Sequence, residues 1–152
     1  MPLGLRGVTR VNKHQLSLFL SEAREALEVA KQILSEHSLE EFMHDMEARY
    51  ALRHALVLLV EALADALTLI LEADHGVAPE SYREAMLLGG EAGIIPYEDA
   101  EELAKLASLR NVLIHRYWRV DDARLYRETG KGLEKIARVL EALSRYAEDS
   151  DP

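Results

Sequence analysis

The segment from Ala55 to Leu71 most constrains the fold, because nearly every residue in it is apolar. Only Glu61, Asp65 and Thr68 interrupt its seventeen residues, so a helix formed here carries apolar side chains on almost all of its faces. A carboxylate at the centre of a bilayer costs about 2.5 kcal/mol or more, and the two acids therefore make it a poor membrane span. We predict that residues 39 to 72 form the central helix of a bundle, with no membrane contact.

Four polar residues form a ridge along this predicted helix. Tyr50, His54, Glu61 and Asp65 follow one another at offsets of four, seven and four, which place their side chains on one face. Polar groups on an otherwise apolar helix need partners. We therefore expect other elements to approach this ridge, and a second copy of the chain can also cover this helix.

The remainder of the chain is also predicted to be helical. Leu, Ala, Glu and Arg dominate the composition, and these side chains lose little entropy in a helix. Apolar residues recur every three or four positions, which predicts helices over residues 12 to 35, 81 to 91, 98 onward, and 121 to 147. The expected fold class is all-α, an up-and-down bundle of about five helices.

Several residues mark the expected helix boundaries. Ser38 is suited to an N-cap, and Gly76 to a left-handed C-cap of the central helix. Pro79 is expected in the first turn of the next helix, because its fixed φ suits that position. Three glycines are expected to break that helix: Gly89, Gly90 and Gly93.

A chain of 152 residues is the size of one domain. We expect a flexible arm over residues 1–11, a single helical domain over 12–148, and a frayed acidic tail over 149–152. The first thirteen residues lack an apolar core of signal-peptide length, and the chain has no cysteine. These features fit a reducing, cytoplasmic location and exclude disulfides, thiolate metal sites and a cysteine nucleophile.

The net charge of −9 argues against broad, nonspecific binding to nucleic acid, which depends on clustered cations. One segment has the opposite sign. From Ser108 to Arg119 the chain contains three arginines and no acid. Any contact with an anionic partner is therefore expected to be local and to involve this segment.

Four residues of this acid-free segment suit phosphate chemistry without a metal or a cofactor. Arg110 can hold phosphate oxygens with its guanidinium, and His115 can move a proton near neutral pH. Asn111 and Tyr117 add an amide and a phenol. With RNA the nucleophile is already present, because the ribose 2′-OH lies beside the scissile phosphate.

The helical phase of these residues leaves alternatives open. Arg110 and Tyr117 fall on the apolar stripe of their helix, where Leu is expected, so Arg110 is either functional or a structural ion pair with Glu61 or Asp65. On a regular helix Arg110 and His115 point about 140° apart and cannot meet at one phosphate. The helix must then end near residue 114, or a second copy of the chain completes the site.

The sequence Arg110-Asn-Val-Leu-Ile-His115-Arg-Tyr117 resembles the signature of HEPN-domain ribonucleases, and in particular the HepT-like toxins. That signature consists of an Arg, four residues, a His, one residue and a Tyr. Further segments resemble the same family over nearly the whole chain: 50 to 65, 76 to 82, 91 to 96 and 121 to 126.

The resemblance implies a homodimeric, HEPN-like helical bundle with two motifs facing each other in a cleft. It implies metal-independent RNA cleavage, and a minimal nucleotidyltransferase antitoxin that neutralises the toxin by adding AMP to the motif tyrosine. On this sequence the implied roles are catalysis for Arg110 and His115, support for Asn111 and modification for Tyr117. Beyond the resemblance, Arg116 is expected to support the site, and Glu61 or Asp65 to orient the arginine, because one carboxylate can do so.

Two other functions remain possible on the sequence. The first is a non-catalytic HEPN subunit that binds nucleotide or a nucleotidyltransferase partner, in which the arginine holds a phosphate without proton transfer. The second is a purely structural helical dimer. The remaining histidines have no metal-ligand spacing, so no metal site is expected: His14, His37, His44, His54 and His75.

Overall fold

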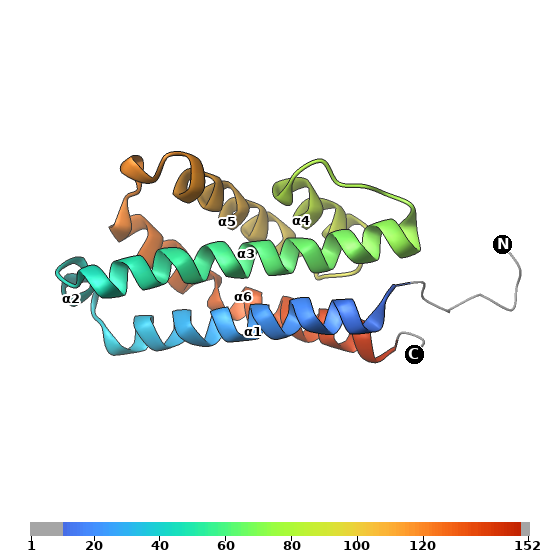
Figure 1. Cartoon of the computed structure of the whole chain (residues 1–152), viewed down its shortest axis with the longest axis horizontal. Helices are drawn as coiled ribbons and strands as arrows, with labels where there is room; N and C mark the ends of the chain where they lie inside the picture. Colours follow the sequence, from blue (N-terminus) through green and yellow to red (C-terminus); the bar gives the residue numbers. More distant parts are fainter. Residues whose placement is uncertain (1–10, 150–152) are drawn as a thin grey trace, which may run out of the picture.

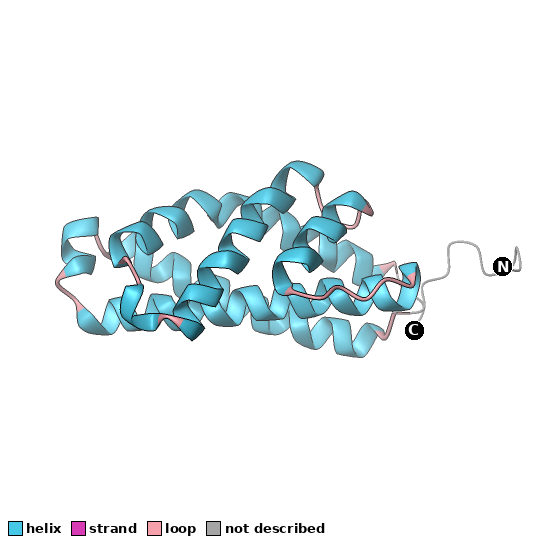
Figure 2. Ribbon diagram, turned by 90° about the horizontal axis from the view of Figure 1, so that it is seen from above, coloured by secondary structure: helices cyan, strands magenta, loops and turns pink. Residues whose placement is uncertain are grey.

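The computed structural model describes residues 11–149, and the fold class is all-α as predicted. The expected arm and acidic tail lie outside the described residues, apart from Val11, which is buried, and Asp149. Figure 2 shows helices joined by short loops and, within the described part, no strand. The elements are α1 (Lys13–Glu36), α2 (Leu39–Met43), α3 (Met46–His75), α4 (Tyr82–Glu91), α5 (Tyr97–His115), the 3-10 turn η2 (Tyr117–Arg119) and α6 (Asp122–Glu148).

Helix α3 is the centre of the bundle, as its apolar sequence predicts. It contacts all five other α-helices, with α1 and α6 on one side and α4 and α5 on the other (Figure 1). Leu52, Leu56, Leu63 and Leu67 are fully buried along it. Among the described helices, α3 alone is long and apolar enough to cross a membrane, and most of its apolar window is buried, as in the core helix of a bundle.

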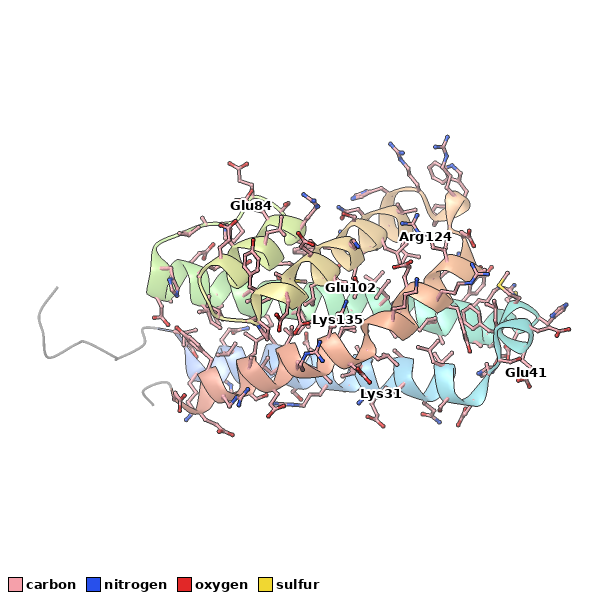
Figure 3. All side chains as sticks on the ribbon, turned by 180° about the vertical axis from the view of Figure 1, so that it is seen from behind. Lys31, Glu41, Glu84, Glu102, Arg124 and Lys135 are labelled. Atoms are coloured by element: carbon pink, nitrogen blue, oxygen red, sulfur yellow. The ribbon has the colours of Figure 1, made fainter. Side chains whose placement is uncertain are left out.

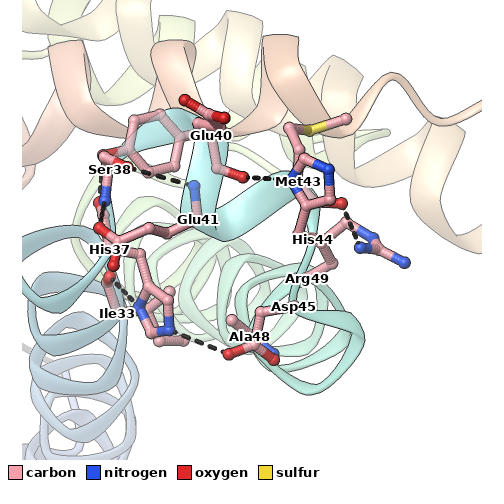
Figure 4. Close-up of polar contacts among 11 residues, drawn as sticks. Ile33, His37, Ser38, Glu40, Glu41, Met43, His44, Asp45, Ala48 and Arg49 are labelled. Atoms are coloured by element: carbon pink, nitrogen blue, oxygen red, sulfur yellow. Dashed lines mark hydrogen bonds and ion pairs between the residues drawn. The ribbon is translucent and has the colours of Figure 1, made fainter.

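The predicted helix over 39 to 72 is in fact two helices, with a break at His44 and Asp45. The Asp45 side chain caps α3 by accepting the backbone N–H of Ala48 at 3.0 Å, and it also lies 3.2 Å from His37 Nε2 (Figure 4). An aspartate side chain that accepts a nearby backbone N–H competes with helical hydrogen bonding, so it favours the start of a helix over its interior. The apolar periodicity does not contain this signal, and the predicted single helix was therefore wrong. The predicted cap at Ser38 is confirmed, as part of a capping box with Glu41.

The segment after α3 shows two further differences from the sequence prediction. Gly76 has the expected left-handed conformation, with φ of 65°. Pro79, however, lies in the loop, and α4 begins after the N-cap Ser81, whose hydroxyl accepts the N–H of Glu84. Gly89 and Gly90 lie within α4 and do not break it.

The two glycines inside α4 allow close packing. A Cβ at Gly89 would lie 2.7 Å from a methyl of Leu67, and one at Gly90 would lie 2.5 Å from the Cβ of Ala100. The absence of a side chain therefore lets α4 approach α3 and α5 closely, and this approach outweighs the low helix propensity of glycine.

We predict opposite effects for two glycine-to-alanine substitutions. Gly90→Ala should lower the free energy of unfolding by about 1–3 kcal/mol, because the new methyl group overlaps Ala100. Gly130→Ala, the matched control in α6, should raise it by up to about 1 kcal/mol, since open space surrounds that position. Urea unfolding of both variants measures the difference; equal effects would contradict the close approach of α4 and α5.

Candidate functional site

Helix α5 ends within the motif, so the motif residues do not share one helical surface. His115 is the last residue of α5, and Arg116 leaves the helix with φ −139° and ψ 44°. Tyr117 then begins the turn η2. The helix ends close to the expected residue 114, but α5 still includes both Arg110 and His115, so its end does not bring the two side chains together. The placement of Tyr117 on the core-directed stripe was wrong, because Tyr117 is 64% exposed.

Arg110 lies on the buried side of α5 and pairs with Glu61 of α3. Its Nη2 and Nε donate to the same carboxylate oxygen, at 2.5 and 3.2 Å, and its side chain is 14% exposed. A charge in such a position requires a counter-ion. The position on the apolar stripe is therefore accommodated by an ion pair between α3 and α5.

Tyr82 of α4 completes the surroundings of this arginine. The Arg110 guanidinium carbon lies 4.7 Å from the centre of the Tyr82 ring, within the range of a cation–π contact. Burial, followed by the nearby carboxylates of Asp65 and Glu61, raises the pKa of the Tyr82 phenol. Sequence reasoning did not assign Tyr82 to the site, since the contact depends on how α4 packs against α5.

Of the two predicted orienting carboxylates, only Glu61 contacts Arg110. Within the described chain, no ion pair or hydrogen bond to Asp65 is found. Burial raises the pKa of Asp65, the negative charges of Glu61 and Glu22 raise it further, and Arg110 acts in the opposite direction. Asp65 therefore interacts electrostatically with Arg110 and Glu61 but makes no hydrogen bond or ion pair with the guanidinium.

His115 and Asn111 project from a different side of α5. Both are exposed, as is Arg116, and no contact joins His115 to Arg110 within residues 11–149. Asn111 Oδ1 accepts a long hydrogen bond of 3.3 Å from Arg110 Nη1 and thus lies between the two. One chain therefore presents the guanidinium and the imidazole on separate surfaces.

Tyr117 lies at the rim of a shallow cavity between α3 and α5. The cavity has a volume of about 440 Å³ and is lined by Tyr50, His54, Leu58, Glu61, Leu113 and Ile114, among others. The Trp118 ring packs edge-on against Tyr117, with centroids 5.3 Å apart, and is 68% exposed. The polar ridge predicted on α3 thus faces this cavity at Tyr50, His54 and Glu61.

By their chemistry, the Arg110 guanidinium can hold and polarise a phosphate, and the His115 imidazole can transfer a proton. Glu61 accepts from Nε and Nη2 of Arg110, and Asn111 accepts from Nη1, which leaves one N–H of Nη1 and one of Nη2 for another acceptor. The His115 side chain is exposed to solvent. The described residues contain no group of three or more His, Asp or Glu side chains placed to hold a metal ion.

An all-α bundle with an Arg, His and Tyr motif at the end of one helix agrees with the comparison to known families. The sequence model of the family described as "Ribonuclease HepT-like" matches residues 23–143. The chain therefore belongs to the HepT-like ribonuclease family, which is of the HEPN type. A search of curated protein sequences finds no match.

Solved structures show that the fold is shared. A cytosolic protein of unknown function, YutE from Bacillus subtilis, is 19% identical with a TM-score of 0.79, covering 93% of this chain and 94% of that one. A tri-AMPylated HEPN toxin from Shewanella oneidensis, solved with its MNT antitoxin, is 18% identical with a TM-score of 0.77, covering 86% and 97%. A toxin-antitoxin complex with AMP-PNP is 17% identical with a TM-score of 0.74, covering 85% and 97%.

The raised pKa of Asp65 predicts a pH-dependent contribution to stability. The pKa of Asp65 is higher in the folded protein than in the unfolded chain. Between about pH 4 and the raised pKa, the folded state therefore binds more protons than the unfolded state. The free energy of unfolding decreases as pH rises through this window. Asp65→Asn should therefore increase the free energy of unfolding at pH 7 and flatten its dependence on pH over this window.

Urea unfolding at several pH values measures this effect. Glu72→Gln is the matched control, because it removes the same charge from an exposed position on α3. The explanation fails if Asp65→Asn is no more stable at pH 7 than the parent protein, or if Glu72→Gln changes the pH dependence equally.

Proposed function

We propose that this protein is a metal-independent endoribonuclease toxin of a HEPN and minimal nucleotidyltransferase toxin-antitoxin pair, acting in the cytoplasm. The main support is the Arg110 guanidinium, which Glu61 and Tyr82 hold with N–H groups left for another acceptor. A solvent-accessible His115 follows five residues later, at the end of α5. Membership of the HepT-like family supports the same conclusion.

The proposed reaction uses the substrate's own nucleophile. His115 accepts the proton of the ribose 2′-OH, whose oxygen forms a bond to phosphorus while the bond to the 5′-oxygen breaks. That leaving oxygen takes up a proton from an imidazolium or from water, which gives a cyclic phosphate and a free 5′-OH. Arg110 stabilises the charge that develops on the phosphate oxygens, and the acid-base step contributes about 10² to 10⁴ in rate.

A second copy of the chain is proposed to complete the site. Arg110 and His115 point apart within one chain, so each phosphate would meet the arginine of one copy and the histidine of the other. An exposed apolar surface beside the motif suits such a dimer, since large side chains from α1, α3 and α5 remain uncovered there: Val29, Tyr50, Leu58 and Ile114. His54 and Leu58 line cavities on both sides of α3 and make this surface continuous.

Complementation between inactive variants tests the shared site. Arg110→Ala and His115→Ala should each abolish RNA cleavage. When the two are co-expressed, half of the dimers should be mixed, and each mixed dimer has one intact site of two, so cleavage should recover to about a quarter of the wild-type rate. Arg110→Lys should replace Arg110→Ala if loss of the Glu61 pair prevents folding, because it keeps the charge but not the two-pronged geometry.

Three results would count against this proposal. No recovery in mixed dimers, isolated by two different tags, would place each site within one chain. Strong inhibition of the wild type by EDTA would contradict the metal-free reaction. Binding of nucleotide or of a nucleotidyltransferase, without RNA cleavage at any pH from 5 to 9, would instead indicate a non-catalytic HEPN subunit in which Arg110 holds a phosphate without proton transfer.

The proposed antitoxin is a minimal nucleotidyltransferase that adds AMP to Tyr117. The exposure of this side chain supports the proposal, as does the absence of a hydrogen bond to its hydroxyl within the described chain. The Shewanella oneidensis HEPN toxin that shares the fold is tri-AMPylated. A modified Tyr117 would add negative charge beside the arginines of this segment and oppose the binding of an RNA phosphate.

Intact-mass measurement after co-expression with a minimal nucleotidyltransferase tests this regulation. The wild type should gain one or more AMP units and lose RNA cleavage, whereas Tyr117→Phe should gain none and stay active. Tyr97→Phe is the control, because Tyr97 is similarly exposed, 71%, at the other end of α5. Mass gain on Tyr117→Phe would contradict the assignment.

A further inference from the structure

The cations of this protein fall into two groups. Those on α3 and α6 mostly pair with carboxylates: Arg53 with Asp122 at 2.7 Å, and Arg138 with the buried Asp99 at 2.8 Å. Within the described chain, six cations between positions 83 and 127 have no carboxylate within salt-bridge distance: Arg83, Lys105, Arg116, Arg119, Arg124 and Arg127. Three others without such a partner lie on α1: Lys13, Arg24 and Lys31. Six of the nine unpaired cations in the described chain therefore lie around α5 and the turn that follows it.

Three of these unpaired cations line one surface groove. Arg83 of α4, Lys105 of α5 and Arg124 of α6 border a cavity of about 670 Å³, to which Glu101 contributes the single carboxylate. The local charge is therefore positive in a chain whose net charge is −9. Figure 3 shows Arg124 on the α5 side of the bundle, and Lys31 on α1 at the opposite edge.

The groove points along α5 toward the candidate catalytic histidine. Ser108 and Val112 line the groove, and His115 lies seven residues after Ser108, so the two residues differ by only about 20° around the helix axis. From Lys105 to His115 the helix rises about 15 Å. Arg110 is about 160° from Ser108 around the helix, on the side that faces Glu61.

We propose that this groove, bordered by Arg83, Lys105 and Arg124, binds the phosphates of the RNA strand on one side of the scissile bond. The proposal rests on the proposed ribonuclease function and adds a substrate-binding surface separate from the Arg110–Glu61 pair. Phosphates held by the three side chains would lead the strand along α5 to His115. The released counter-ions would provide much of the binding free energy.

The groove lining indicates which part of RNA it recognises. Its floor is aliphatic, with Leu87, Leu109 and Val112, and its lining includes no aromatic ring or side-chain amide. Bases are bound by stacking on rings or by hydrogen bonds to their edges, whereas cations bind phosphates of any sequence. The groove is therefore expected to contribute affinity and little sequence preference.

Binding of single-stranded RNA by a non-cleaving His115→Ala protein tests the groove. Replacing Arg83, Lys105 and Arg124 together by Gln should weaken binding about 10- to 100-fold at low salt. The slope of log affinity against log salt should fall in magnitude by about 2, because each lost phosphate contact removes about 0.7. The loss should be the same for oligonucleotides of different sequence.

The control carries the same change in charge elsewhere on the surface. Lys31→Gln, Lys131→Gln and Arg145→Gln together remove three exposed cations from α1 and α6. This control should weaken binding less than about 3-fold and leave the salt slope unchanged. In the cleaving protein, the groove substitutions should raise KM and leave kcat within about 3-fold, since none of the three residues reaches the reacting atoms.

Each other outcome overturns the inference in a distinguishable way. Cleavage of RNA by the wild type, with equal binding by the groove and control variants, would overturn the groove alone. Absence of both RNA binding and cleavage would overturn the groove together with the proposed function. If the groove variant binds RNA as well as the parent protein does but no longer binds a nucleotidyltransferase, the groove is a protein-docking surface instead.

Discussion

The burial of α3 is the constraint on which the rest of the structure depends. A helix with apolar residues on nearly every face must be covered from several directions, and here the five other α-helices do so. A polar side chain of α3 that is drawn toward this core is costly unless another group pairs with it. Glu61 is the clearest case, because its carboxylate fixes Arg110 of α5 and so couples the packing of the core to the candidate site.

The Arg110–Glu61 pair can be both structural and functional. An ion pair with the arginine side chain only 14% exposed is costly to break, which explains a charge on the apolar stripe of α5 without any reference to catalysis. The same pair, with the Tyr82 ring against the guanidinium, also holds the arginine in one orientation. A group held in place before substrate binds loses less entropy when a phosphate arrives, so the structural interaction serves the proposed chemistry.

The end of α5 separates the surfaces of the molecule. Because the helix stops at His115, the imidazole is accessible, and Tyr117 turns onto the cavity beside α3. The apolar surface over α1 and α3 then lies on one side of the motif and the basic groove on the other. A second copy on the apolar surface would leave the basic groove open to RNA up to the end of α5, where the shared site is proposed.

The sequence by itself determined the all-α class, the central helix, most helix boundaries and the motif that identifies the family, because hydrophobic period, caps and motif spacing are local properties. It also offered Glu61 as a partner for Arg110. Only the tertiary structure decided that Glu61 and not Asp65 makes the contact, that Tyr82 joins it, and that Asp45 divides the second helix. The glycines of α4 show most directly why the sequence was not sufficient. Their low helix propensity is a local signal, and it predicted a break in the helix. The close approach to Leu67 and Ala100 that favours glycine exists only once distant helices pack together.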